Sequence, residues 1–252
     1  MTDDLWGMGD FNAVAEKIAD AGQTLVEAAG IEPGMDVLDV GCGTGNATIP
    51  AAKLGARVTG LDASPGLIAI ARELGADAMV EVDWVVGDAQ ALPFEDASFD
   101  RVISIFGHMF APDHRAAGDE LKRVCRPGGR IAIACWTPEG KIGEMFKHMS
   151  AFAPPPPDGS QPPVLWGAEE HVRELLGDGA RFERHDVVWV DSSAEAYAKF
   201  MEDSFPPLVA ARQRVGHEPV HDAYLGFLEE ANEADDGSFR FRGEYLLSTL
   251  DG

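Results

Sequence analysis

The chain has 252 residues, and its composition excludes several classes of protein. Hydrophobic residues make up 45% and charged residues 25%, as in globular domains rather than disordered chains. No apolar run approaches the roughly 18 residues that a membrane span needs, and the acidic N-terminus lacks the basic and apolar regions of a secretory signal. We therefore expect a cytoplasmic protein with no membrane partner, built as one α/β domain or a domain with an insertion.

The net charge and the cysteines indicate which partners and metal sites to expect. Acidic residues outnumber basic ones by 43 to 20, which gives a formal net charge of −23. Such a surface repels a phosphate backbone, and because the arginines stand singly among acids we expect no nucleic-acid partner. The three cysteines, Cys42, Cys125 and Cys135, show no paired metal-ligand spacing, so we expect reduced thiols and no metal site.

Strands and helices alternate in the first half of the chain. The predicted strands cover 35–40, 57–62, 82–86, 99–106 and 130–136, the last of them after a turn at 126–129. The predicted helices cover 11–29, 46–54, 66–74 and 116–124. Buried strands separated by helices predict a parallel sheet wrapped on both faces.

The second half is less regular. A run of prolines within 153–163 predicts a loop or hinge, because successive prolines form neither helix nor central strand. The later predictions are helices at 169–176, 194–215 and 220–231, a sixth strand at 182–190, and a closing edge strand at 244–250. The chain then divides into an N-terminal helical cap (1–30), a sheet core (31–136), a lid and substrate region (137–243) and the closing edge strand (244–252).

A glycine-rich loop follows the first predicted strand. The segment GCGTG at 41–45 can turn tightly and let a ligand lie against the backbone. Asp62 ends the second predicted strand, 21 positions after Gly41. Ligands bind at the carboxyl ends of parallel strands, where an acid can accept hydrogen bonds from both ribose hydroxyls. Together the two features predict a site for an adenosine-type cofactor.

The details of the loop favour one cofactor. A dinucleotide-binding loop follows the pattern G-x-G-x-x-G, but Asn46 stands where the third glycine falls. Asp39 precedes the glycines, and there is no lysine as in a phosphate-binding loop. S-adenosylmethionine (SAM) carries an ammonium and a sulfonium but no phosphate, so an acidic rim suits it on charge grounds. The alternative is an NAD(P)-dependent oxidoreductase on a related sheet.

A second acid supports the nucleoside site. Asp88 lies in Gly87–Asp88–Ala89, directly after the third predicted strand. Its carboxylate can accept from the adenine amino group beside a backbone N–H that donates to the ring. The other interpretation of Asp88 is a helix cap or turn residue. For Asp62 that interpretation is weaker, because Ser64 and Pro65 already supply a helix start and leave the acid for a ligand.

Four segments resemble, in order, the motifs of the class I SAM-dependent methyltransferases. They are VLDVGCGTGNATIPAA (37–52), VTGLDAS (58–64), GDAQALPFEDASFDRVIS (87–104) and LKRVCRPGGRIAIACW (121–136). The resemblance covers 11–136 and is to the small-molecule branch with the ubiquinone and menaquinone methyltransferases. It implies a Rossmann-like, doubly wound α/β sheet of seven strands with the last antiparallel, a helical lid, and SAM as cofactor with S-adenosylhomocysteine as product.

The resemblance also implies roles for residues by their position in the motifs. Around the methionine moiety these are Asp39, Gly41, Cys42 and Gly43; at the ribose Asp62; around the adenine Ala63, Leu67, Asp88 and Ala89; and facing the sulfonium Phe106, Gly107 and His108. Asn46 and Gly87 are also expected to bind the cofactor. Trp6, Asp10 and Phe11 belong to a segment that resembles a cap closing over the cofactor.

Methyl transfer from a sulfonium is an in-line displacement, so the enzyme chiefly positions the acceptor and excludes water. A base helps only if the acceptor arrives protonated, and His108 is the candidate base, although a histidine in that loop can equally shape the pocket. The fourth-strand loop lacks the N/D-P-P-Y/F motif of amide and base N-methyltransferases.

Methionine and aromatic residues in 137–242 predict an apolar or aromatic small-molecule acceptor, methylated on oxygen, nitrogen or carbon. They are Met145, Phe146, Met149, Phe152, Trp166, Phe200, Met201, Phe205, Tyr224 and Phe227. A non-catalytic SAM-binding protein is the second alternative, since this chemistry requires no fixed catalytic side chain. The sequence leaves the oligomeric state open.

Overall fold

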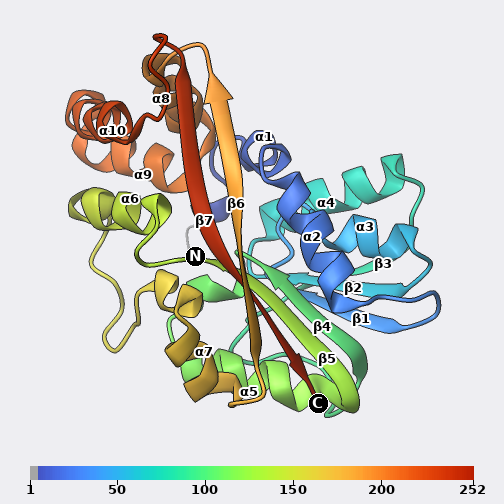
Figure 1. Ribbon diagram of the computed structural model, residues 1–252. Coiled ribbons are helices and arrows are strands. Elements are labelled where there is room, and N and C mark those ends of the chain that lie inside the picture. Colours follow the sequence, from blue (N-terminus) through green and yellow to red (C-terminus); the bar gives the residue numbers. More distant parts are fainter. Residues whose placement is uncertain (1–4) are drawn as a thin grey trace.

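A computed structural model describes residues 5–252 as a seven-stranded sheet with helices on both faces (Figure 1). The strand order is β3-β2-β1-β4-β5-β7-β6. The strands are β1 (Asp36–Val40), β2 (Arg57–Asp62), β3 (Val82–Val86), β4 (Phe99–Ile105), β5 (Cys125–Trp136), β6 (Arg181–Asp191) and β7 (Phe239–Asp251). Only β7 pairs in antiparallel fashion, with β5 on one side and β6 on the other, among the described strands. The predicted doubly wound sheet with an antiparallel last strand is confirmed.

The helices form two face layers and a cap. Helices α2 (Ala19–Ala29), α3 (Thr48–Lys53) and α4 (Pro65–Asp77) cover one face, and α5 (His114–Val124) and α7 (Glu169–Leu176) cover the other (Figure 1). The cap consists of α6 (Lys141–Met149), α8 (Ala194–Ser204), α9 (Pro206–Val215) and α10 (His217–Ala231), with the short α1 (Phe11–Glu16) beside it.

Local sequence rules explain how these elements begin and what they bury. The Ser64 side chain accepts a hydrogen bond from the Leu67 N–H and Pro65 follows it, which is the predicted start of α4. In β1 the consecutive residues Val37, Leu38, Asp39 and Val40 are fully buried, as expected for a strand covered on both faces.

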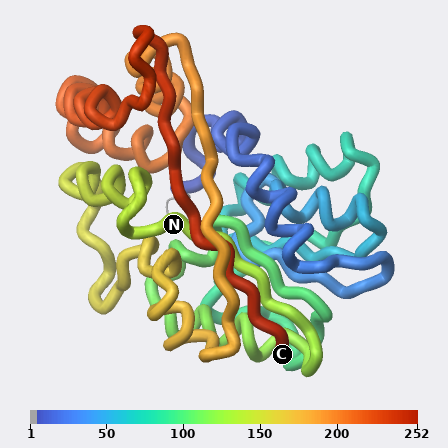
Figure 2. Tube along the Cα trace, in the orientation of Figure 1, coloured from blue at the N-terminus to red at the C-terminus, as the bar shows by residue number. Residues whose placement is uncertain are grey.

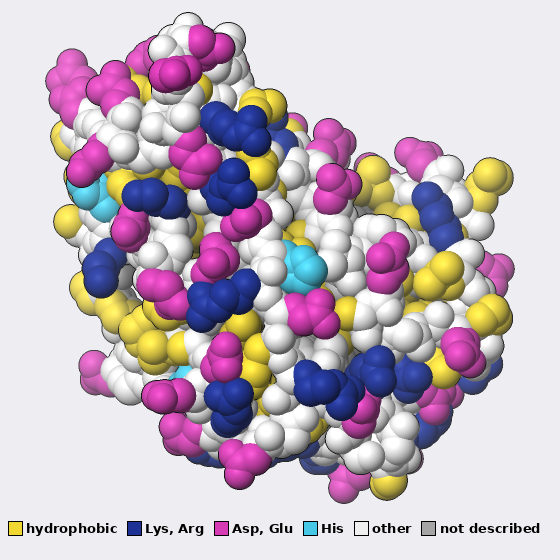
Figure 3. All heavy atoms as spheres, viewed as in Figure 1, with side chains coloured by type: hydrophobic (Ala, Val, Ile, Leu, Met, Phe, Trp, Pro, Cys, Tyr) yellow, Lys and Arg dark blue, Asp and Glu magenta, His cyan; other side chains and the backbone are white. Residues whose placement is uncertain are grey.

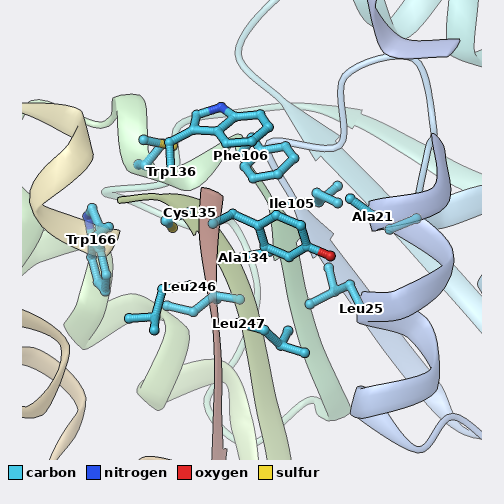
Figure 4. Close-up of a cluster of buried hydrophobic side chains, with 14 of the residues drawn as sticks. Ala21, Leu25, Ile105, Phe106, Ala134, Cys135, Trp136, Trp166, Leu246 and Leu247 are labelled. Atoms are coloured by element: carbon cyan, nitrogen blue, oxygen red, sulfur yellow. The ribbon is translucent and has the colours of Figure 1, made fainter. Parts of the chain in front are cut away.

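The core continues to the ends of the strands. Phe106 and Trp136 stack with ring centroids 3.8 Å apart and an interplanar angle of 6°. Figure 4 shows this pair above the sheet, with Leu25 from α2 on one side and Trp166 on the other. The floor of any site at this end of the sheet is therefore packed aromatic core.

One predicted helix is interrupted before a proline. The sequence predicted helix throughout 194–215, but the structure breaks it into α8 and α9 at Phe205, which is extended (φ −82°, ψ 114°). A residue before proline disfavours the helical conformation, and Pro206 suits the first position of a new helix. The predicted helix 11–29 is likewise divided into α1 and α2, and the predicted turn 126–129 lies within β5, where its register with β4 shifts.

The prediction of a closing edge strand is wrong in its place and its length. β7 begins at Phe239, so the predicted boundary at 243/244 falls inside it, and it lies between β5 and β6. The continuous burial of Tyr245, Leu246 and Leu247 is typical of an inner strand. The edge strand on this side of the sheet is β6, whose exposed Arg184 pairs with Glu139 and Glu244. Figure 3 shows such basic and acidic side chains interspersed on this face, a pattern that discourages edge-to-edge pairing.

The long strands β6 and β7 carry the chain beyond the rest of the sheet, where the cap helices pack (Figure 1). Figure 2 shows the N-terminal segment running beside this cap, and α1 contacts α8 while the turn η1 (Leu5–Gly7) contacts α9. Between residues 5 and 252 the structure has no helix long and apolar enough to span a bilayer.

Candidate functional site

A cavity of about 510 Å³ opens at the carboxyl ends of the strands, where the strand order reverses between β1 and β4. Residues from the glycine loop, the N-terminal segment and the cap all line it. Its wall includes fifteen residues singled out from the sequence: Trp6, Phe11, Gly41, Cys42, Gly43, Asn46, Asp62, Ala63, Leu67, Gly87, Asp88, Ala89, Phe106, Gly107 and His108. The structure thus brings these positions together, and their roles in binding stay predictions.

The backbones after β1 and β4 touch at two glycines. A Cβ on Gly107 would lie 2.1 Å from the Gly41 carbonyl oxygen, and a Cβ on Gly41 would lie 2.7 Å from the Gly107 carbonyl carbon. Gly41 also has a φ of +68°, which side chains rarely adopt. Phe106, directly before Gly107, takes a φ of +54° although it is not glycine. These conformations turn both loops sharply across the strand ends and open the cavity floor.

Asp62 has a structural task as well as a place in the cavity wall. Its Oδ2 accepts a hydrogen bond from the Gly43 N–H at 2.8 Å, and its Oδ1 accepts from the Ser64 N–H at 2.9 Å. The expectation that Ser64 leaves this acid entirely to a ligand is therefore too simple. Each carboxylate oxygen has a second lone pair, so Asp62 can hold the glycine loop and still accept from a ligand hydroxyl.

Asp88 holds a turn and also lines the cavity, while its role toward adenine stays a prediction. Its Oδ1 accepts from the Gln90 N–H at 2.9 Å, which shapes the turn after β3. The same residue lines the cavity with Ala89 and Gln90. A carboxylate and backbone N–H groups therefore border the end of the cavity nearest β3, an arrangement that can read the edge of a purine.

The charge of the cavity wall favours a cationic ligand. Asp62 and Asp88 are the acidic residues that line it, and within 5–252 no lysine or arginine does. A pyrophosphate would meet acids without a compensating cation, whereas the ammonium and sulfonium of SAM would be attracted to them. The residues present therefore fit SAM better than a dinucleotide.

The N-terminal segment closes one side of the cavity. The Asn46 side-chain amide donates to the Ala15 carbonyl oxygen at 2.7 Å, which ties the glycine loop to α1. Trp6 packs edge-to-face against Phe11 and against Phe110, with ring centroids 5.6 and 4.7 Å apart. Asp10 does not line the cavity; it caps α1 by accepting from the Ala13 N–H.

Towards the cap the cavity becomes an aromatic lobe. We use this name for the part lined by Trp136, Met145, Phe146, Trp189, Tyr197, Met201, Phe205, Tyr224 and Phe241. Five of the ten residues predicted from 137–242 belong to it, and Met149, Phe152, Trp166, Phe200 and Phe227 do not. Sequence reasoning missed the other four members of the lobe, which are Trp136, Trp189, Tyr197 and Phe241. The alternation of Phe239, Arg240, Phe241 and Arg242 was the available signal for a strand there.

Comparisons with known proteins agree with this geometry. Residues 38–133 match the family described as "Methyltransferase domain". An uncharacterized protein of Mycobacterium tuberculosis strain H37Rv is 40% identical over 98% of this chain and 92% of its own length. The demethylmenaquinone methyltransferase of Renibacterium salmoninarum is 38% identical, over 48% of this chain and 52% of its own.

The solved structure of geranyl diphosphate C-methyltransferase from Streptomyces coelicolor A3(2), determined with S-adenosyl-L-homocysteine, has the same fold. It superposes with a TM-score of 0.54 at 16% identity, over 92% of this chain and 76% of its own. The chain belongs to the class I SAM-dependent methyltransferases. SAM is therefore the cofactor, and the dinucleotide alternative is not favoured.

The surroundings of His108 do not favour its predicted role as a base. Its side chain is buried against Trp166, with ring centroids 4.6 Å apart, and its Nε2 lies 3.6 Å from the Cys135 sulfur. Burial, followed by the nearby His114, lowers its pKa to about 3. A residue of that pKa is neutral at physiological pH but binds a proton weakly, which does not suit general-base catalysis. We infer that His108 shapes the pocket floor.

Asp39 lies beneath the glycine loop rather than in the cavity wall. It is fully buried, and its Oδ2 accepts from the Thr48 hydroxyl at 2.6 Å. Burial is the main cause that raises its pKa to about 7. Because Asp39 does not line the cavity, its contact with the amino group of SAM, as implied by the resemblance, stays a prediction.

We expect Gly107→Ala to remove SAM binding and to lower the free energy of unfolding by about 3 kcal/mol, because the new methyl group would overlap the Gly41 carbonyl. Gly226→Ala is the control: it lies within α10 with open space around it, and should raise stability by up to about 1 kcal/mol. Isothermal titration with SAM and urea unfolding measure the two effects. Unimpaired SAM binding by Gly107→Ala would refute the close contact.

The buried histidine predicts a pH effect. Unfolded His108 takes up a proton below about pH 6.5, whereas the folded residue does not until about pH 3. Its contribution to stability should therefore fall by about 1.4 kcal/mol per pH unit below pH 6.5. Asp39, with its raised pKa, acts in the opposite direction, so the informative quantity is the difference between the wild type and His108→Gln.

Urea unfolding of both proteins from pH 7.5 to 5.5 measures that difference. A difference that does not change with pH would contradict a neutral, buried His108. The same variant tests the base hypothesis, since loss of a general base lowers kcat by about 10²–10⁴-fold, and we expect a much smaller effect.

Proposed function

We propose that this protein transfers the methyl group of SAM to an apolar or aromatic small-molecule acceptor bound in the aromatic lobe. The observation that carries the proposal is the continuity of one cavity from the glycine loop and Asp62 to Trp189, Tyr197 and Tyr224. Its volume of about 510 Å³ lies within the range usual for small-molecule sites. Cofactor and acceptor can thus meet in one enclosure.

SAM supplies a methyl group on a sulfonium, which is a good leaving group. The chain's own residues then bind, orient and exclude water. Trp6, Phe11 and Phe110 cover the cavity from the N-terminal side, and Phe106 with Trp136 forms part of its floor. Such a wall keeps an acceptor near the reacting carbon and removes competing water.

Tyr224 and Tyr197 each bring a hydroxyl to the residues that form the aromatic lobe, and that of Tyr224 is the one found buried without a partner in the described part of the chain. The Tyr224 ring that carries this hydroxyl is fully buried. Burial raises the pKa of this hydroxyl well above its usual value, so it stays protonated and can donate. An unpaired buried hydroxyl is unfavourable, and an acceptor that presents one oxygen or nitrogen to it would relieve that cost. The lobe therefore suits a largely apolar molecule that carries an oxygen or nitrogen for Tyr224.

The decisive test titrates the purified protein with SAM, S-adenosylhomocysteine and NAD⁺. We expect micromolar affinity for the first two, at least tenfold weaker binding in Asp62→Asn, and no binding of NAD⁺. The Gly226→Ala protein controls for an unrelated substitution. Formation of S-adenosylhomocysteine is then followed with phenolic, apolar amine and small polar acceptors. Turnover of only the highly polar acceptors would overturn the proposed acceptor class, and SAM binding without any turnover would favour a non-catalytic protein.

We expect Tyr224→Phe to raise the free energy of unfolding by about 1 kcal/mol, since it removes an unpaired buried hydroxyl. The same change should raise the KM for the acceptor about tenfold and leave the Kd of SAM unchanged. Thermal unfolding and SAM titration need no known acceptor, so the first and last effects can be measured at once. A destabilised variant would show that the hydroxyl has a structural partner.

A further inference from the structure

A cluster of metal-ligating side chains lies outside the cavity, where α8 packs against α10 (Figure 1). Glu202 comes from α8, and His217 and His221 come from the first two turns of α10. The His221 Nδ1 lies 2.9 Å from Glu202 Oε1, and the His217 Nδ1 lies 3.5 Å from Glu202 Oε2. One ligand atom from each residue lies within 4.8 Å of the others.

We propose that Glu202, His217 and His221 bind a divalent transition-metal ion such as zinc. Histidine at i and i+4 places two imidazoles on one helix face, and a carboxylate opposite them completes three protein ligands. A tetrahedral zinc ion with bonds of about 2.0–2.1 Å separates its ligand atoms by roughly 3.3–3.4 Å. The separations of 2.9 and 3.5 Å bracket that value. The three ligand atoms, which lie within 4.8 Å of one another, would close to that spacing around the ion, and solvent would supply the fourth ligand.

The surroundings support the ligand set. Glu202 is 2% exposed, so its carboxylate is already desolvated and held in place by the packing of α8. A second carboxylate, from Glu195, lies 3.6 Å from His221 Nε2, on the side of the ring away from Glu202. Metal-binding histidines usually present their other nitrogen to a carboxylate, which fixes the ring orientation. His217 is half exposed and leaves an entry path for an ion.

Arg212 is the positive group that would compete with an ion. Its guanidinium lies 4.0 Å from Glu202 Oε2. Its shorter contacts, both 2.9 Å, go to the Asp203 carboxylate and to the backbone carbonyl of Glu202. The carboxylate oxygens of Glu202 thus face the two histidines more closely than they face Arg212.

A bound ion would fasten α8 to α10 beside the cavity. Tyr197 and Met201 on α8 and Tyr224 on α10 belong to the aromatic lobe. The metal would therefore brace a wall of the acceptor site without touching the reacting atoms. This inference does not depend on the proposed methyl transfer.

The test titrates chelator-treated, full-length protein with zinc chloride by calorimetry. We expect one zinc per chain at micromolar affinity or better, and a melting temperature raised by roughly 5 °C at zinc 100-fold above Kd. His217→Ala and Glu202→Gln should each weaken binding at least tenfold. His148→Gln is the matched control, because His148 is exposed and packs on α10 through the Ala223 carbonyl but lies outside the cluster.

Cobalt added in place of zinc should give visible d–d absorption bands that are lost in His217→Ala. Since His217 is half exposed, its removal should not disturb folding, and this variant decides the question even if Glu202→Gln unfolds. No stoichiometric zinc binding by the wild type, or equal binding by His217→Ala, would overturn the proposal. Titration with SAM in the same samples shows separately whether the cofactor site is intact.

Discussion

The contact between Gly41 and Gly107 is the constraint on which the site depends. It joins the loops after the first and fourth strands, which are neighbours in the sheet but 66 positions apart in sequence. Any side chain at either position would push the loops apart and move everything they carry. Phe106 holds its left-handed conformation beside this contact, and stacking on Trp136 offsets its strain. Backbone conformation, rather than side-chain chemistry, thus sets the shape of the cofactor end.

The other end of the cavity is built differently. There the walls come from long strands and helices that meet at the cap, and they are made largely of aromatic rings, among them Tyr224 with its unpaired hydroxyl. Under the proposed function, the cofactor end is thus shaped by backbone and the acceptor end by side chains, which can be exchanged without moving the glycine loop. The N-terminal segment contacts both ends of the cavity. Ala15 accepts a hydrogen bond from Asn46 of the glycine loop, and Trp6 packs against Phe205 of the aromatic lobe.

The sheet and the cofactor end could be predicted because local signals determine them. Gly41, Asp62 and Asp88 each lie at the carboxyl end of a strand. Parallel strands place their carboxyl ends at the same edge of the sheet, so these residues can be grouped from the sequence alone. The aromatic lobe could be predicted only in part, because Trp189 and Phe241 reach it through the pairing of β6 with β7, which no local pattern specifies. The same holds for Glu202 and His217, which are 15 positions apart and meet only when two helices pack. The pKa values of His108 and Asp39 likewise depend on burial that neighbouring residues do not reveal.

The placement of the tryptophans has a practical consequence. Three of the five, Trp6, Trp136 and Trp189, line the cavity, whereas Trp84 and Trp166 lie elsewhere. Indole emission responds to the polarity and the contacts of the ring, so the intrinsic fluorescence of this protein should report cavity occupancy without an added label. Trp6 covers the cavity from the N-terminal side and Trp189 lies in the aromatic lobe. Single-tryptophan versions could therefore distinguish closure of the N-terminal segment from filling of the acceptor site.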